Sequence, residues 1–341
     1  MTDVLSPESG TPTLRLSTPG DLIAAVPVLM GFHPRDSLVV ISTACPVGGR
    51  VGLTLRVDLP LPEHRDDLAA MVVQTITTAG DTGPPGGAVV LVVAAPGPLG
   101  LPPGREVAGL VAAGLRECGV AADSVLWAAG TRGGEPWRCY EPCGCTGTVA
   151  DPSSSVAMVH AVADGRVVEA TREDLAARLV PADPAAIGRR EALLRDGDPL
   201  PTDPVRCVAD AVAAAGGGAP RLDDRAAVAL VAALGTAEGR DTALRLTCGL
   251  AGSPRPAPAD PCAAEALWAA LTREVPDPEA AEPAALLALA AQLRGDGAYA
   301  LVALDRAEQA WPGHRLTRLI GGLLASGVSP ARLRTWLGSQ D

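Results

Sequence analysis

The hydrophobic pattern changes once along this chain, and that change sets the strongest limit on the fold. Residues 38–42 and 51–58 are rich in β-forming residues, and residues 88–95 form a fully apolar run typical of a central strand. From residue 224 onwards, apolar residues recur with helical spacing, and no strand pattern interrupts them. Between these parts, residues 181–204 contain five prolines among charged and small residues. The sequence therefore predicts two separate hydrophobic cores joined by a proline-rich linker.

The first part predicts a mixed β-sheet flanked by helices, in a fold of the α+β or α/β class. The expected elements are a helix at 22–30, strands at 38–42 and 51–58, a helix at 66–78, a strand at 88–95, a helix at 105–118 and strands at 124–129 and 136–140. After the first helix the order is ββαβαββ, with an antiparallel hairpin first and an edge strand last. Two further helices, at 153–163 and 171–179, are expected to cover one face of the sheet.

The second part predicts an all-α domain. Its expected helices are at 224–234, 242–250, 262–271, 283–294, 298–310, 316–325 and 330–337. Residues 284–312 resemble one tetratricopeptide unit, in which small residues allow close helix crossing and a proline ends the second helix. The predicted organisation is a disordered tail at 1–12, an α/β domain at 13–180, a linker at 181–205 and a helical, repeat-like domain at 206–341.

Charge and composition exclude several classes of function. The formal net charge is −11, and the 28 cationic residues are all Arg. An acidic chain with no basic run repels phosphate backbones and anionic headgroups, so neither nucleic acid nor a membrane surface is an expected partner. The absence of lysine excludes a P-loop lysine, a pyridoxal Schiff base and an S-x-x-K acylation site. No apolar run has the length of a membrane span and no export signal is visible, so we expect a cytoplasmic protein.

Short motifs spread along the chain resemble a known family. They are Leu16–Leu22, Gly31–Leu38, Arg56–Pro60, Trp137 with Tyr140 and the Cys143/Cys145 cluster, Thr171–Glu173 and Gly295–Gly297. These motifs are similar to those of the bacterial domain-of-unknown-function family 4192, over nearly the full length of the chain. The resemblance implies a bacterial, cytoplasmic protein of two parts, and it implies no particular activity. Family members usually carry an adjacent Cys pair followed by Pro, where this chain has Cys143-Gly144-Cys145-Thr146.

Three cysteines lie within seven residues and raise the question of a metal site. Cys139, Cys143 and Cys145 are soft ligands, and His160 or Cys118 could complete the four donors of a tetrahedral zinc site. The C-x-x-x-C-x-C spacing is not that of a standard zinc knuckle. Structural or free thiols are therefore the preferred interpretation, with zinc and a redox pair as alternatives. No other cofactor is expected.

Polar residues inside the family-like motifs form a second candidate site. These are Asp36, Ser37, Arg56, Asp58 and Arg172, and the two aspartates lie near predicted strand ends, where α/β sheets often open a ligand crevice. If the five side chains converge, they would bind an anionic or polar ligand. The alternative is that Asp36 and Ser37 cap a turn while Arg56 and Asp58 pair across the hairpin.

The remaining polar and aromatic candidates are interpreted as structural. His33 lies in a turn without an accompanying nucleophile motif, and His314 is expected to end a helical turn. The tryptophans Trp268, Trp311 and Trp336 are expected to be packing residues.

No catalytic residue is predicted, because the patterns G-x-S-x-G, H-E-x-x-H and G-x-G-x-x-G are all missing from the sequence. The preferred hypothesis is a non-enzymatic binding or regulatory module. Its helical half would offer a concave surface lined by Arg and Leu to a protein partner. The alternative is an enzyme or small-molecule binder with an Asp/Arg pocket in the N-terminal half.

Overall fold

The computed structural model describes most of the chain. The described residues are 18–43, 51–78, 85–151, 167–181, 183–197, 201–216, 220, 222–250, 262–326, 328, 332–333 and 335. The chain divides into two compact units. Unit 1 comprises residues 1–29, 33–72 and 85–168, and unit 2 comprises 30–32, 73–84 and 169–341. The tail expected at 1–12 and the helix expected at 153–163 lie outside the described residues.

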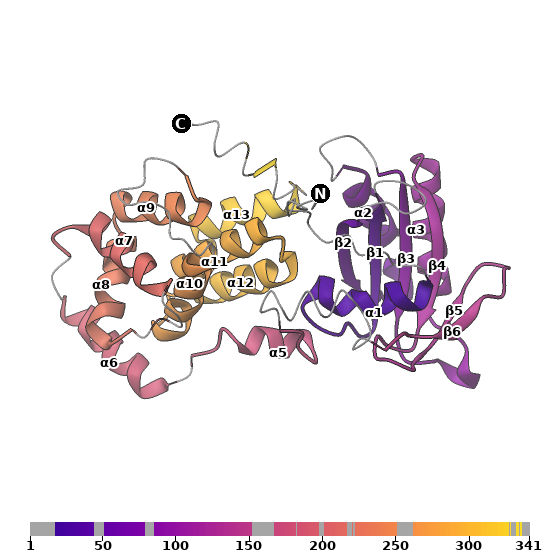
Figure 1. The fold of residues 1–341 in the computed structure, drawn as a ribbon, viewed down its shortest axis with the longest axis horizontal. Helices are drawn as coiled ribbons and strands as arrows, with labels where there is room; N and C mark the ends of the chain where they lie inside the picture. Colours follow the sequence, from indigo (N-terminus) through magenta and orange to yellow (C-terminus); the bar gives the residue numbers. More distant parts are fainter. Residues whose placement is uncertain are drawn as a thin grey trace, which may run out of the picture. The chain divides into compact units, whose positions relative to one another are not determined.

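Unit 1 is built on a six-stranded mixed sheet with the strand order β2-β1-β3-β4-β5-β6 (Figure 1). The strands are β1 Ser37–Thr43, β2 Val51–Asp58, β3 Gly87–Val93, β4 Ala121–Ala128, β5 Pro136–Cys139 and β6 Thr146–Thr148. Strands β1 and β2 form the predicted antiparallel hairpin, and β3 has the predicted central position. Among the strand pairs that the structure describes in this sheet, only β3–β4 is parallel. The fold is therefore α+β, as the sequence indicates.

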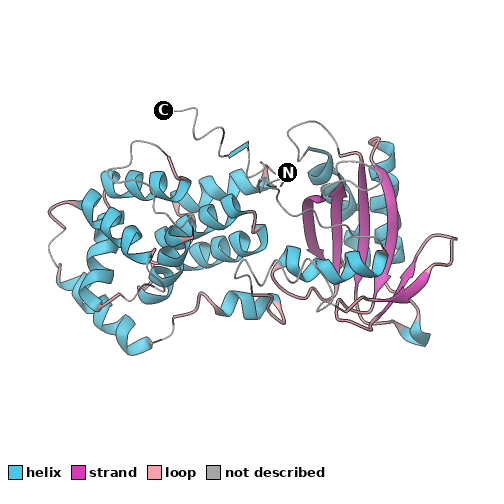
Figure 2. Ribbon diagram, in the orientation of Figure 1, coloured by secondary structure: helices cyan, strands magenta, loops and turns pink. Residues whose placement is uncertain are grey.

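Among the residues that the structure describes, three helices cover the sheet, with α1 on one face and α2 and α3 on the other (Figure 2). Their bounds are α1 Pro19–Met30, α2 Arg65–Thr78 and α3 Arg105–Glu117, and short 3-10 turns lie at Pro62–His64 and Pro98–Gly100. Because helices lie over both faces, every residue of β3 is buried, which explains its continuous apolar sequence. On the helices, Ile23, Val72 and Leu115 are fully buried.

The end of the sheet differs from the prediction. Strand β5 was expected at the edge, but β6 pairs with it in antiparallel register and takes the edge position. The indole Nε1 of Trp137 donates to the carbonyl oxygen of Thr148, and the ring lies so close to Gly147 that a Cβ there would meet it at 2.9 Å. Strand β6 escapes prediction because it is short, fully exposed and carries no apolar pattern.

The described elements of unit 2 are mainly helices, and α11 lies at the centre of its C-terminal group. The helices are α5 Arg172–Ala177, α6 Pro184–Asp196, α7 Pro204–Ala215, α8 Asp224–Leu234, α9 Ala237–Cys248, α10 Ala263–Glu274, α11 Ala281–Arg294, α12 Gly297–Ala310 and α13 Arg315–Ala325. Helix α11 is buried along almost its whole length and contacts α9, α10, α12 and α13. A helix that is apolar on all sides is expected at the centre of a helical core. The helix expected at 330–337 lies largely outside the described residues.

The expected linker at 181–205 is the largest difference from the predicted organisation. Helix α6 occupies its centre, and α7 begins at Pro204. Both helices start at an Asp-Pro pair, in which the Asp183 or Asp203 carboxylate accepts a hydrogen bond from a backbone N–H of the first turn, at 2.9 Å in each case. The prolines were interpreted as chain breakers, but proline is favoured at the first helical position, where its missing N–H costs nothing. No helix among the described residues could cross a membrane.

Candidate binding pocket

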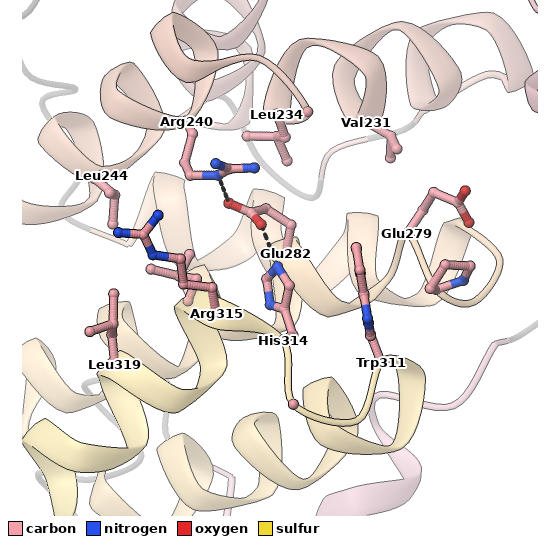
Figure 3. Close-up of a pocket in the computed structure, with 14 residues that line it drawn as sticks. Val231, Leu234, Arg240, Leu244, Glu279, Glu282, Trp311, His314, Arg315 and Leu319 are labelled. Atoms are coloured by element: carbon pink, nitrogen blue, oxygen red, sulfur yellow. Dashed lines mark hydrogen bonds and ion pairs between the residues drawn. The ribbon is translucent and has the colours of Figure 1, made fainter.

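A cavity of about 610 Å³ opens in unit 2 between the ends of several helices (Figure 3). Its walls come from α8, α9, the start of α11, the α12–α13 turn and α13. The lining residues are Val231, Leu234, Gly235, Arg240, Leu244, Pro278, Glu279, Glu282, Trp311, Gly313, His314, Arg315, Leu316 and Leu319. A volume of this order can accept a large side chain or a small ligand.

The turn after α12 places two aromatic rings in the pocket. Pro312 cannot continue the helix, and Gly313 has φ +77°, a left-handed conformation that favours glycine. The Glu308 carboxylate holds this turn by accepting from the Gly313 N–H at 2.9 Å. The turn brings Trp311 and His314 together with ring centroids 5.2 Å apart.

A buried carboxylate links the walls of the pocket. Glu282 lies in the first turn of α11, where the positive end of the helix dipole favours an acid. Its Oε1 accepts from Nε of Arg240 at 2.5 Å, and its Oε2 lies 2.8 Å from Nε2 of His314. Because the Glu282 and His314 side chains are only 12% and 9% exposed, little water competes for these bonds. The group ties α9, α11 and the start of α13 together.

The contacts of His314 indicate which ring nitrogen faces which partner. Nε2 faces a carboxylate and must therefore carry a proton. Nδ1 lies 3.0 Å from Oγ1 of Thr317, from which it accepts in the neutral ring and to which it donates in the imidazolium. Every polar atom of the ring is thus engaged within the pocket wall. His314 was expected to end a helical turn, but it lies at the N-cap position of α13 and therefore precedes a helix.

The mouth of the pocket is apolar and carries two side chains without partners. Trp311 and Leu319 are 51% and 58% exposed, although both are large hydrophobic residues. The side chains of Arg315 and Glu279 form no hydrogen bond or ion pair with any residue that the structure describes. Figure 3 shows Trp311 on one side of the Glu282–His314 pair and Arg315 on the other. The pocket therefore offers apolar surface beside one uncompensated cation and one uncompensated anion.

The packing role expected for the tryptophans holds only in part. Trp268 is fully buried, and its Nε1 donates to Oγ1 of Thr247 at 2.8 Å. Trp311, in contrast, is half exposed, so the expectation of a core residue is wrong for it. The residue follows the last turn of α12, where the chain leaves the helical core. Trp336 lies outside the described residues.

Four of the five residues of the predicted Asp/Arg site lie together on the β1–β2 hairpin. Ser37 and Asp58 are opposite each other in the register. Arg56 Nε donates to the buried Ser37 Oγ at 2.9 Å, and its Nη2 pairs with Asp58 at 2.5 Å. Asp36 occupies a turn with φ 44°, and its carbonyl oxygen accepts from the N–H of Leu59. Both bonds of the Arg56 guanidinium are therefore made to residues of the same hairpin, Ser37 and Asp58.

Two further candidates have ordinary structural partners. Arg172, the fifth residue of the predicted site, belongs to unit 2, where it forms an ion pair with Asp305 of α12. His33 Nδ1 lies 2.8 Å from Oγ1 of Thr131 in unit 1. Burial and then the nearby Arg132 lower the pKa of the His33 imidazole, which favours its neutral form.

The predicted metal site is incomplete within the described residues. Cys139, Cys143 and Cys145 are free thiols at the β5–β6 turn, and His160 lies outside the described residues. Across the described ranges, no group of three or more His, Cys, Asp or Glu side chains is arranged to hold a metal ion. Cys118, the alternative fourth ligand, is an exposed free thiol at the end of α3.

Comparison with known proteins gives one match. The chain matches the model of the domain of unknown function DUF4192 over residues 19–331. No curated protein and no solved structure matches it significantly. Because the match extends over nearly the whole chain and includes both the sheet and the helical unit, the protein belongs to the DUF4192 family.

Proposed function

We propose that the protein is a non-enzymatic binding module of the bacterial cytoplasm, and that the pocket of unit 2 receives a segment of a protein partner. The observation that carries this proposal is the exposure of Trp311 and Leu319 beside the unpaired cation Arg315. Exposed tryptophan and arginine are the residue types that most often dominate the energy of protein interfaces. An apolar side chain inserted at this mouth would remove both hydrophobic surfaces from water.

The charges indicate which segment fits. Glu282 already neutralises Arg240, whereas Arg315 pairs with no anion among the described residues. A partner carboxylate next to the inserted apolar residue would therefore pair with Arg315. The chain as a whole carries a net charge of −11, which disfavours a long acidic tract. The preferred ligand is a short segment with one apolar anchor and one adjacent Asp or Glu.

The hairpin of unit 1 supports the alternative small-molecule function less well. Arg56 and Asp58 pair with each other, and Ser37 is fully buried. A ligand there would have to displace these bonds, while the pocket in unit 2 offers an unpaired cation at no such cost. The helical unit is therefore the preferred site.

The test uses the full-length protein and peptides selected from a random library displayed on phage. We expect selected peptides to share an apolar residue beside an acidic one. Calorimetry should show that Trp311→Ala and Arg315→Glu each weaken binding at least tenfold, which corresponds to about 1.4 kcal/mol.

Arg318→Glu is the matched control for Arg315→Glu. Arg318 is exposed on the same helix, α13, but does not line the pocket, and the two variants have the same net charge. Binding by Arg318→Glu should stay within about twofold of the original protein, since a charge outside the contact acts only through screened, long-range terms. Equal weakening by both variants, or selected peptides without an apolar-acidic pair, would contradict the proposal.

A further inference from the structure

The β5–β6 turn gathers three thiols that the pocket does not use. Cys139 ends β5, and Cys143 and Cys145 follow in the turn, where both are exposed. The backbone N–H of Cys139 donates to the carbonyl oxygen of Cys145 at 2.9 Å, which closes the turn. Gly144 has φ +67°, so the chain folds back between the two exposed cysteines. The backbone N–H of Cys145 consequently reaches Sγ of Cys143, at 3.5 Å.

These three thiols are not equivalent. The adjacent Cys145, through its thiol and its backbone N–H, and then the nearby Cys139 thiol lower the pKa of Cys143; the contact to its sulfur is the Cys145 N–H, at 3.5 Å. Burial raises the pKa of Cys139, whose Sγ lies 3.5 Å from the carbonyl oxygen of Val125. The neighbouring Cys143 thiol raises the pKa of Cys145, whose own Sγ lies 4.0 Å from the carbonyl oxygen of Cys143. A backbone N–H directed at a sulfur favours its thiolate, which is the nucleophilic form of cysteine.

The charged residues next to the turn pair mainly with α3 and not with the thiols. Glu141 lies two residues before Cys143, and its negative charge opposes a thiolate there. Its carboxylate is drawn to Arg116 of α3, with 2.7 Å between Oε1 and Nη2. Arg105 donates to the carbonyl oxygen of Tyr140 at 2.8 Å and fixes the start of the turn. The turn is thus anchored to α3 at its base, while the two exposed sulfurs remain accessible.

We propose that the turn is a thiol–disulfide exchange site in which Cys143 is the attacking thiol and Cys145 the resolving thiol. The co-reactant is a low-molecular-weight disulfide. Cys145 is assigned the resolving role because it is exposed and adjacent to Cys143, whereas Cys139 is half-buried and directed to a backbone carbonyl. The site would make this hairpin responsive to the redox state of small thiols.

Two exchange steps complete the reaction. The Cys143 thiolate attacks one sulfur of the small disulfide, whose S–S bond breaks, and one half leaves as a thiolate that takes up a proton. The other half remains bound to Cys143 as a mixed disulfide. Cys145 then loses its proton to solvent and attacks Sγ of Cys143, which releases the second half as a thiolate. Two protein thiols are thereby oxidised, and one small disulfide is reduced to two thiols.

The experiment treats the reduced full-length protein with oxidised glutathione and maps the products by mass spectrometry over time. Cys118 is the internal control, because it is an exposed thiol in the same unit, and no hydrogen bond joins it to another thiol among the described residues. We expect a glutathione adduct at Cys143 several times faster than at Cys118, followed by a Cys143–Cys145 disulfide. Reaction of Cys143 at the rate of Cys118 or slower would overturn the proposal.

Two variants test the assigned roles. Cys145→Ser should accumulate the mixed disulfide at Cys143, because the resolving thiol is missing, while Cys143→Ser should leave the turn unmodified. Both residues are exposed, so the fold should be kept, and circular dichroism checks this. If Cys145→Ser instead forms a Cys139–Cys143 disulfide as fast as the original protein closes its own, the assignment of Cys145 is wrong.

Discussion

Arg190 is one of the few charged side chains that are almost completely buried in the described part of the chain. It is 4% exposed, and its guanidinium donates to Asp224, to the side chain and carbonyl of Glu274, and to the carbonyl of Leu222. It thereby joins α6 to α8 and to the end of α10. A buried cation with this many acceptors contributes mainly because its removal leaves several acceptors unpaired.

We therefore expect Arg190→Ala to destabilise the protein by about 2–4 kcal/mol, because it removes a buried cation that joins three helices and leaves two carbonyl oxygens and two partly exposed carboxylates without this donor. The neighbouring Arg189 provides a matched control, since it also bonds to Asp224, at 2.7 Å, but is 58% exposed. Arg189→Ala should change the free energy of unfolding much less. Urea unfolding of both variants measures the difference. Equal effects would mean that Arg190 acts only through its surface pair with Asp224.

The residues of the binding pocket show why such a site is hard to find in a sequence. Arg240, Glu282 and His314 come from three separate segments, and each is an ordinary polar residue of an amphipathic helix or a turn. No motif or fixed spacing connects them. The expectation of an Arg- and Leu-lined surface indicated the residue types, but not the carboxylate that organises them. The three cysteines, in contrast, were found at once because they are close in sequence.

Several helices of unit 2 begin with an aspartate N-cap. Asp203 precedes Pro204 of α7, and its Oδ1 accepts from the N–H of Arg206. Asp183 and Asp223 cap α6 and α8 in the same manner. An N-cap of this kind satisfies one of the N–H groups that a helix leaves unpaired at its start.

Asp203→Ala should lower the stability of the protein by about 1 kcal/mol, because the cap is lost while the helix interior is unchanged. Asp203→Asn is the control, since the Asn amide oxygen accepts the same hydrogen bond and Asn is an equally good cap. Thermal unfolding monitored by circular dichroism compares the two. If Asn is as harmful as Ala, the contribution of Asp203 comes from its charge and not from the cap.

Helices with a long, regular hydrophobic pattern were predicted from the sequence. Helices whose start is marked mainly by an Asp-Pro pair were not. The expected helix at 224–234 coincides with α8, and the one at 283–294 lies within α11. Helices α6 and α7 were missed because their prolines outweighed the preceding Asp in the interpretation. Strand β6 was missed for a different reason. It owes its place to the Trp137 ring and to pairing with β5, which are tertiary contacts.

Each of the two units has a hydrophobic core of its own. Leu91 of β3 and Leu287 of α11 are both fully buried, one at the centre of the sheet and the other at the centre of the helical core. If the cores are energetically separate, a cavity in one should destabilise that unit alone. Leu91→Ala and Leu287→Ala make equal chemical changes at these two positions, so that each serves as the control for the other.

Hydrogen exchange followed by mass spectrometry reports on each unit separately, because amide protection reflects the local free energy of opening. A cavity from Leu→Ala costs about 3 kcal/mol, which corresponds to roughly a hundredfold faster exchange where exchange requires unfolding of the unit. We expect this acceleration in β3 but not in α11 for Leu91→Ala, and the reverse for Leu287→Ala. Equal acceleration in both elements by either variant would show one cooperative core, because a cavity can propagate only through contacts that unfold together.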